Sequence, residues 1–184
     1  MYVRFHEYLI SHRRSGYLDR DPEMELRLVG QYKEGVDLTL AYLDLVRFLS
    51  LNHQELAIIV KPHTSEDPEI WQQLLAGTDR VRVDTGTPTS QLIRQSAAVI
   101  TSGSVTAFEA ELSETPLISF QPMDTSHRNT GFADRLGNKG QTVEEVGKVL
   151  SGILSARHEK VFNGSPKTAK VDTRQKVYFD DDQL

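Results

Sequence analysis

Short apolar runs alternate with helical segments along most of this chain. Residues 36 to 51 place Leu38, Tyr42 and Leu45 at helical spacing, and a continuous apolar run at 56 to 60 follows them directly. Further helices are expected at 67 to 77, 89 to 96, 106 to 114 and 142 to 156, and further strands at 81 to 86, 97 to 101 and 116 to 122. This alternation predicts an α/β fold, with a Rossmann-like, doubly wound, mainly parallel sheet and helices on both faces.

The two ends of the chain differ from this pattern. Residues 1–35 carry many charges and only a weak helical pattern, so we expect a lead-in or hinge segment there. Residues 36–156 hold the alternating elements and form the predicted Rossmann-like domain. Residues 157–184 are polar with isolated apolar residues, which predicts an extended or poorly ordered tail.

Composition excludes several classes of function. The chain has 184 residues, a formal net charge of −5 and no cysteine, so disulfides, thiolate metal sites and cysteine nucleophiles are absent. The acidic balance argues against a general nucleic-acid binder, which needs a basic face. No apolar run approaches the ~20 residues of a transmembrane helix, and no signal peptide is recognisable. We expect a cytoplasmic protein that reaches the inner face of the membrane only through partners.

The turn after the strand at 97 to 101 is a candidate phosphate site. It carries Ser102, Gly103 and Ser104 just before a predicted helix. The first N–H groups of a helix have no intrahelical partner and the helix dipole favours negative charge, so such a turn can bind an anion. Gly103 allows close approach of the backbone, and the hydroxyls of Ser102, Ser104 and Thr106 can add hydrogen bonds. The alternative is that Ser104 simply caps the helix.

A second candidate loop, KPHTSE, follows the strand at 56 to 60. Because the carboxyl ends of parallel strands share one sheet edge, we expect His63 on the same edge as the Ser-Gly-Ser turn. A histidine there can donate to a phosphate or neutralise a leaving group. Lys61 can supply positive charge, Ser65 can cap the next helix, and Glu66 lies at the start of that helix.

Other polar residues carry weaker signals. Glu109 lies one turn into the helix at 106 to 114, where it is either a solvated carboxylate or a partner for a ribose hydroxyl. Gly86 and Pro88 mark a third loop that is mainly a turn. His127 and Arg128 lie in a loop that could also reach a ligand. No residue set has metal-ligand geometry, so we assign no metal and no cofactor.

The segments IVKPHTSEDPEIWQQLL and VITSGSVTAFEAELSETPLISFQP together resemble the C-terminal, nucleotide-sugar-binding half of GT-B glycosyltransferases that build bacterial surface or capsular polysaccharides. The surface carbohydrate biosynthesis group has the pattern Arg-Pro-His-Pro-Ser-Glu, then Gly-Cys/Ser-Thr-Thr-Ala-x-Glu-Ala, then Pro-Val-Ile-Ser-Tyr-x-Pro. A similar His-Pro and Ser-Ser/Thr pair occurs in bacterial sialyltransferases, Kdo transferases and CDP-glycerol glycerophosphotransferases. The resemblance covers about residues 36 to 150 and implies one half of a GT-B fold.

This resemblance implies roles for individual residues. His63 would contact the nucleotide phosphate and help the nucleoside phosphate to leave. Ser104 and Thr106 would bind the phosphate, and Glu109 would be the acidic residue of the helix. Thr64 stands where the family has proline and Lys61 where it has arginine. The second change loses the bidentate fork of a guanidinium group.

The resemblance also implies partners. A GT-B enzyme needs a second Rossmann-like domain that brings the glycan acceptor and the catalytic base, and a chain of 184 residues has no room for it. We expect this N-terminal acceptor domain either in a longer chain or in a partner chain. The sequence thus predicts the donor-binding part of a glycosyltransferase that uses a nucleotide donor, with a CMP-linked sugar favoured.

Two alternatives stay open. One is a UDP-N-acetylglucosamine 2-epimerase-like domain, which also has a Ser-Gly turn before an acidic helix, although Phe108, Glu109, Ala110 and Glu111 match it loosely. The other is a module that binds a nucleotide or phosphosugar and assists a partner without catalysis. The preferred nucleotide base separates the first alternative, and turnover separates the second.

Overall fold

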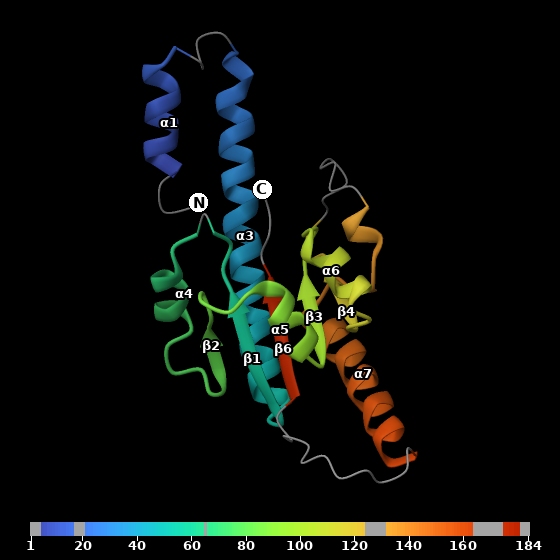
Figure 1. The fold of residues 1–184 in the computed structure, drawn as a ribbon. Helices are drawn as coiled ribbons and strands as arrows, with labels where there is room; N and C mark the ends of the chain where they lie inside the picture. Colours follow the sequence, from blue (N-terminus) through green and yellow to red (C-terminus); the bar gives the residue numbers. More distant parts are fainter. Residues whose placement is uncertain (1–4, 17–20, 65, 124–131, 164–174, 181–184) are drawn as a thin grey trace.

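Figure 1 shows the computed structural model of the chain, which describes residues 5–16, 21–64, 66–123, 132–163 and 175–180. The helices are α1 (Phe5–Arg14), α3 (Pro22–Asn52), α4 (Pro68–Leu74), α5 (Thr89–Gln95), α6 (Thr106–Leu112), the short 3₁₀ helix η2 (Ala133–Arg135) and α7 (Val143–Asn163). The strands are β1 (Leu56–Lys61), β2 (Val81–Val83), β3 (Ala98–Thr101), β4 (Leu117–Phe120), β5 (Asn138–Gly140) and β6 (Gln175–Asp180).

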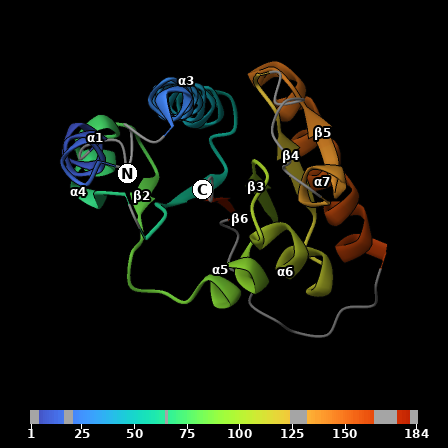
Figure 2. The ribbon, with the colours of Figure 1, turned by 90° about the horizontal axis from the view of Figure 1, so that it is seen from above.

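The strands of the described chain form one six-stranded sheet in the order β2-β1-β6-β3-β4-β5. Every neighbouring pair is parallel. Figure 2 shows helices on both sides of this sheet, with α3 on one side and α5 and α6 on the other. The predicted doubly wound, parallel α/β fold is confirmed.

Successive side chains of a strand point to opposite faces of the sheet, so they belong to two separate hydrophobic cores. Ile58 and Val60 of β1 belong to the larger core, which α3, α4 and α7 cover. Ile59, between them in sequence, belongs to the smaller core under α5 and α6. Strand β3 divides in the same way, because Ile100 joins the larger core and Val99 the smaller one. Strands β1, β3 and β4 are buried on both faces, which explains why their sequences are continuous apolar runs.

The C-terminal region differs from the expected tail. Residues 157–163 continue α7, and residues 175–180 form β6 between β1 and β3, near the centre of the sheet. Val177 is fully buried in the larger core. The expectation of a separate tail over 157–184 is therefore corrected, since part of it forms a strand that joins the two sides of the sheet.

The N-terminal boundary expected after residue 35 also falls inside a continuous element. Helix α3 has 31 residues, so it is about 46 Å long, while the six residues of β1 span about 20 Å. Figure 1 shows the N-terminal half of α3 rising beyond the sheet edge beside α1. An ion pair of 2.7 Å joins Arg13 of α1 to Glu25 of α3. None of the described helices is both long enough and apolar enough to cross a membrane.

Side-chain caps mark the start of two helices. The carboxylate of Asp67 accepts the N–H of Glu69 at 2.9 Å at the start of α4. The hydroxyl of Thr142 accepts the N–H of Glu145 at 3.2 Å before α7. The Glu145 carboxylate reaches back to the N–H of Gln141 at 2.7 Å, one residue before the usual capping-box partner.

Gly137 lies just before β5, the outermost strand on one side of the sheet, and a substitution there tests how closely this strand packs. Its φ is 68°, and a Cβ added there would lie 2.6 Å from the carbonyl oxygen of Leu117. We expect Gly137→Ala to lower the free energy of unfolding by about 2 kcal/mol or more, through backbone strain and overlap. Urea denaturation followed by circular dichroism measures this change.

Gly152→Ala is the matched control, because Gly152 lies within α7 and a Cβ there meets nothing within 4 Å. That variant should be as stable as the wild type or gain up to about 1 kcal/mol from helix propensity. Equal effects of the two substitutions would contradict the described packing at Gly137.

Candidate functional site

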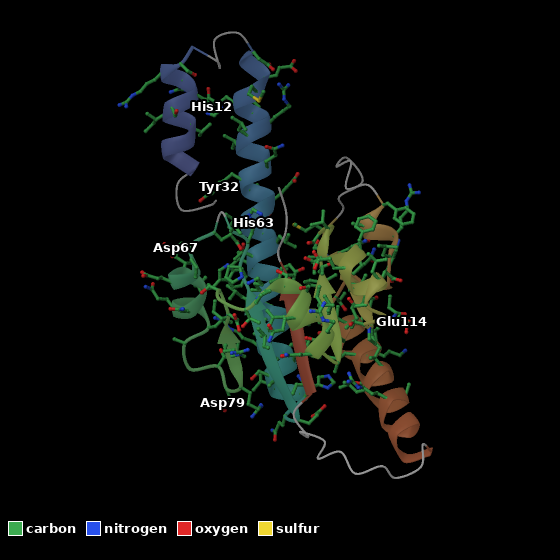
Figure 3. All side chains as sticks on the ribbon, viewed as in Figure 1. His12, Tyr32, His63, Asp67, Asp79 and Glu114 are labelled. Carbon is green, nitrogen blue, oxygen red and sulfur yellow. The ribbon has the colours of Figure 1, made fainter. Side chains whose placement is uncertain are left out.

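The KPHTSE loop leaves the carboxyl end of β1 and closes on itself. The N–H of His63 donates to Oε2 of Glu66 at 2.9 Å, and the N–H of Glu66 donates to the carbonyl oxygen of His63 at 3.0 Å. These two bonds make a tight turn and hold the backbone of the half-buried His63 at the sheet edge (Figure 3). Ser65, also predicted for this site, lies outside the described residues.

The side-chain carboxylate of Glu66 stabilises the His63 loop. Burial raises the pKa of its carboxyl above the usual range, although hydrogen bonds from the His63 backbone and the Trp71 side chain, and the nearby charge of His63, oppose that rise. Trp71 is buried on α4. The carboxylate of Glu66 therefore connects the His63 backbone to α4, the first helix after β1. This contact positions the loop. The ligand contact of Glu66 predicted from the sequence stays a prediction.

Lys61, at the end of β1, contacts the loop that follows the neighbouring strand β2. Its Nζ donates to the carbonyl oxygen of Thr87 at 2.9 Å. The carboxylate of Asp84 accepts the N–H of Thr87 at 2.8 Å and the hydroxyl of Thr87 at 2.9 Å. Lys61 and Asp84 thus fix the third loop to β1. The predicted contact of Lys61 with a phosphate stays a prediction.

Asp84 is a buried carboxylate that the sequence reasoning did not select. Burial raises the pKa of this carboxyl, but the two Thr87 hydrogen bonds and the charges of Arg82 and Lys61 outweigh burial and set the pKa below its usual value. Arg82 forms an ion pair with Asp84 at 3.0 Å. An aspartate followed three residues later by threonine after a strand is the signal that could have revealed this side-chain turn.

The Ser-Gly-Ser turn follows β3 as predicted, but its hydroxyls face inward. The exposed fractions of Ser102, Ser104 and Thr106 are 4%, 0% and 2%. The hydroxyl of Ser104 accepts the N–H of Thr106, the first residue of α6, at 3.0 Å, although the N-cap position itself is Val105, so the bond is close to the capping role of the simpler alternative. Gly103 is half-buried with a φ of 68°, so its backbone forms the accessible part of the turn. A ligand at this turn meets backbone atoms before side-chain hydroxyls.

The two candidate loops lie on the same sheet edge, but they do not follow neighbouring strands. Strand β6 separates β1 from β3, so the axes of these two strands are about 10 Å apart, twice the usual spacing. Glu109 is exposed in the first turn of α6. His127 and Arg128 lie outside the described residues.

Neither a metal site within the described residues nor a known relative adds to this description. Within the described residues, no group of three or more His, Asp or Glu side chains is placed to hold a metal ion. Comparisons of the chain with protein-family models, curated proteins and solved structures find no significant match. Functional assignment therefore depends on the geometry of the sheet edge itself.

Glu66→Gln tests the cost of the buried carboxylate. A glutamate whose pKa is raised by folding contributes stability below its usual pKa of about 4.3, and this contribution is lost as pH rises through the folded pKa. The neutral amide can keep the hydrogen bond from the His63 N–H without that loss. We expect the variant to match the wild type near pH 4 and to be more stable at pH 7.

Trp71, the only tryptophan in the chain, reports unfolding by its fluorescence. A variant that is less stable at pH 7 than at pH 4, each relative to wild type, contradicts this assignment.

Asp84→Asn should show the opposite pH dependence. The lowered pKa means that Asp84 stabilises the fold above its usual pKa and that this contribution is lost as pH falls through the folded pKa. We expect a loss of about 1 to 3 kcal/mol at pH 7 that shrinks below about pH 4. The exposed Asp79, changed to asparagine, is the control and should have little effect at either pH. A loss that does not change with pH would contradict the charge-based account of Asp84.

Proposed function

We propose that this chain is the donor-binding domain of a glycosyltransferase that transfers a sugar from a nucleotide donor to a surface glycan. The observation that supports the proposal best is the position of two loops. The His63 loop and the Ser102–Ser104 turn both follow the carboxyl ends of parallel strands in one doubly wound sheet. Ligands of such sheets bind in the crevice outside the carboxyl ends, at the topological switch point.

The separation of the loops favours an extended phosphate ligand. A ligand that touches both loops must cross the end of β6, over about 10 Å between the axes of β1 and β3. Inorganic phosphate is too small to reach from one axis to the other, whereas a nucleoside phosphate linked to a sugar is long enough. This length favours a nucleotide sugar over a free phosphate as the natural ligand.

In this proposal the two loops have different roles. The imidazole of His63 donates to the phosphate and stabilises the negative charge that develops as the nucleoside phosphate leaves. The backbone at Gly103 accepts close approach of a phosphate oxygen, while the buried hydroxyl of Ser104 keeps the turn in shape. The acceptor and the catalytic base come from a second domain, in a longer chain or a partner chain. Glu109 remains the proposed partner for a ribose hydroxyl.

A non-catalytic nucleotide-binding module is the second candidate. The inward orientation of the hydroxyls of Ser102, Ser104 and Thr106 favours it, because a turn built for its own stability can bind without supporting chemistry. Such a module uses the same edge and the same ligand. It differs in turnover, which stays absent after a candidate acceptor domain is added.

Calorimetric titration of the chain with CMP, CDP, UDP and phosphate tests the site. We expect a cytidine nucleotide to bind more tightly than phosphate, and His63→Ala to weaken that binding about tenfold or more, since it removes a charge-assisted hydrogen bond. The matched control is His53→Ala, because His53 precedes β1 and so lies toward the opposite edge of the sheet. This control should bind as the wild type does.

Each other outcome has a definite meaning. Preference for UDP over the cytidine nucleotides supports the epimerase-like alternative. An equal loss of affinity in His63→Ala and His53→Ala would show an indirect effect on the fold and contradict the role of His63. Absence of binding by every nucleotide contradicts the proposed site.

A further inference from the structure

The order of the strands reveals how this sheet is assembled. The usual dinucleotide-binding sheet has the order 3-2-1-4-5-6, with strand 1 beside strand 4 at the switch point. The order found here, β2-β1-β6-β3-β4-β5, matches it when β6 takes the place of strand 1. The central position is therefore filled by the last described strand along the chain. In terms of sequence, the sheet is a circular permutation of the usual order.

Strand β6 joins two parts of the sheet that have no direct pairing with each other. On one side it pairs with β1 from Leu56↔Gln175 to Lys61↔Asp180. On the other side it pairs with β3 from Ala98↔Val177 to Thr101↔Asp180. Within the described chain, β6 is the only strand that connects the β2-β1 pair with the β3-β4-β5 group.

Each of these two parts carries one of the candidate loops. The His63 loop follows β1, and the Ser-Gly-Ser turn follows β3. Their spacing and their height along the sheet are fixed through the register of Lys61 and Thr101, both of which pair with Asp180. A change in the position of β6 would therefore alter the distance between the loops.

Helix contacts also join the two parts of the sheet. Helix α3 contacts α7 across one face, where Phe48 lies against Gly147, and α5 contacts α6 across the other face. These helix contacts connect the two parts of the sheet independently of strand pairing. Eleven residues separate the end of α7 from the start of β6, whereas β1 follows α3 after only three. Undocking of β6 alone therefore breaks fewer contacts than global unfolding.

We propose that β6 is a clasp: its docking between β1 and β3 assembles the ligand-binding edge, and it docks and undocks as a unit separate from global unfolding. A ligand that contacts both loops binds the docked state and not the undocked state, so binding and docking are coupled. This coupling, though not the separate docking, rests on the proposed nucleotide site.

Hydrogen exchange of the full chain, followed by mass spectrometry, tests the clasp without any ligand. Backbone amides of β6, together with those of β1 and β3 that pair with it, should exchange through an opening that leaves β4 protected. CMP at a hundred times its dissociation constant should then slow exchange in this unit about a hundredfold, because the undocked state does not bind it.

Val177→Ala supplies a test that does not depend on ligand binding. Val177 is fully buried and becomes exposed both on undocking of β6 and on global unfolding, so its truncation should speed exchange of β6 and of β4 alike, by about tenfold. Val146→Ala is the matched control, because Val146 is also fully buried but lies on α7 beside β5. Because Val146 stays packed when only β6 undocks, Val146→Ala should speed exchange of β4 and change that of β6 little, so the ratio of β6 to β4 exchange should fall.

The outcomes separate the clasp from the proposed function. Exchange of β6 and β4 at one common rate, in the wild type and in Val177→Ala, overturns the clasp whether or not CMP binds. Binding of CMP that leaves β6 exchange unchanged overturns the coupling while the nucleotide site stands. If CMP does not bind, the proposed function fails, and the ratio of β6 to β4 exchange in the wild type and in Val146→Ala still decides whether β6 docks separately.

Discussion

The backbone pairing of β6 with both β1 and β3 is the interaction on which the rest of this structure depends. Strand β6 offers hydrogen-bonding groups on both edges, and the register on each side ends at Asp180. Buried backbone N–H and C=O groups need partners, so the inner edges of β1 and β3 depend on β6 for theirs. The continuity of the sheet, and the alignment of the loops above it, follow from this one strand.

The polar residues at the carboxyl ends of the strands fall into two groups: those that stabilise the loops and those proposed to bind a ligand. Asp84, Thr87 and Lys61 bind one another and hold the third loop against β1. Glu66 binds the backbone of His63 in the same way. These contacts position the edge rather than occupy it. The proposed ligand contacts are then His63 and the backbone at Gly103, which is a smaller set than the sequence motifs suggest.

Much of the fold could be predicted from the sequence because its signals are local. Ile58, Ile59 and Val60 form a continuous apolar run, since both faces of β1 are covered, and the Asp67 cap marks the start of α4. Strand β6 could not be recognised in this way. Its place depends on pairing with strands that lie far away in sequence, and its short apolar segment stands within a polar region. The same limit applies to α3, whose charged N-terminal half is helical although its apolar pattern is weak.

The candidate site shows a similar division. The sequence predicted correctly that the His63 loop and the Ser-Gly-Ser turn follow parallel strands. It could not predict that β6 lies between these strands, because that follows from sheet order and not from any motif. The burial of Ser102 and Thr106 was equally hidden, since the residue types that bind phosphate are also those that cap a helix.

Nuclear Overhauser contacts between backbone protons of Tyr178 and its neighbours test the central claim most directly. Tyr178 pairs with Ile59 of β1 on one side and with Val99 of β3 on the other. The account predicts cross-strand contacts from residue 178 to both neighbours, and none between the backbones of Ile59 and Val99. Direct contacts between Ile59 and Val99 would place β1 beside β3, remove β6 from the sheet centre and contradict the account.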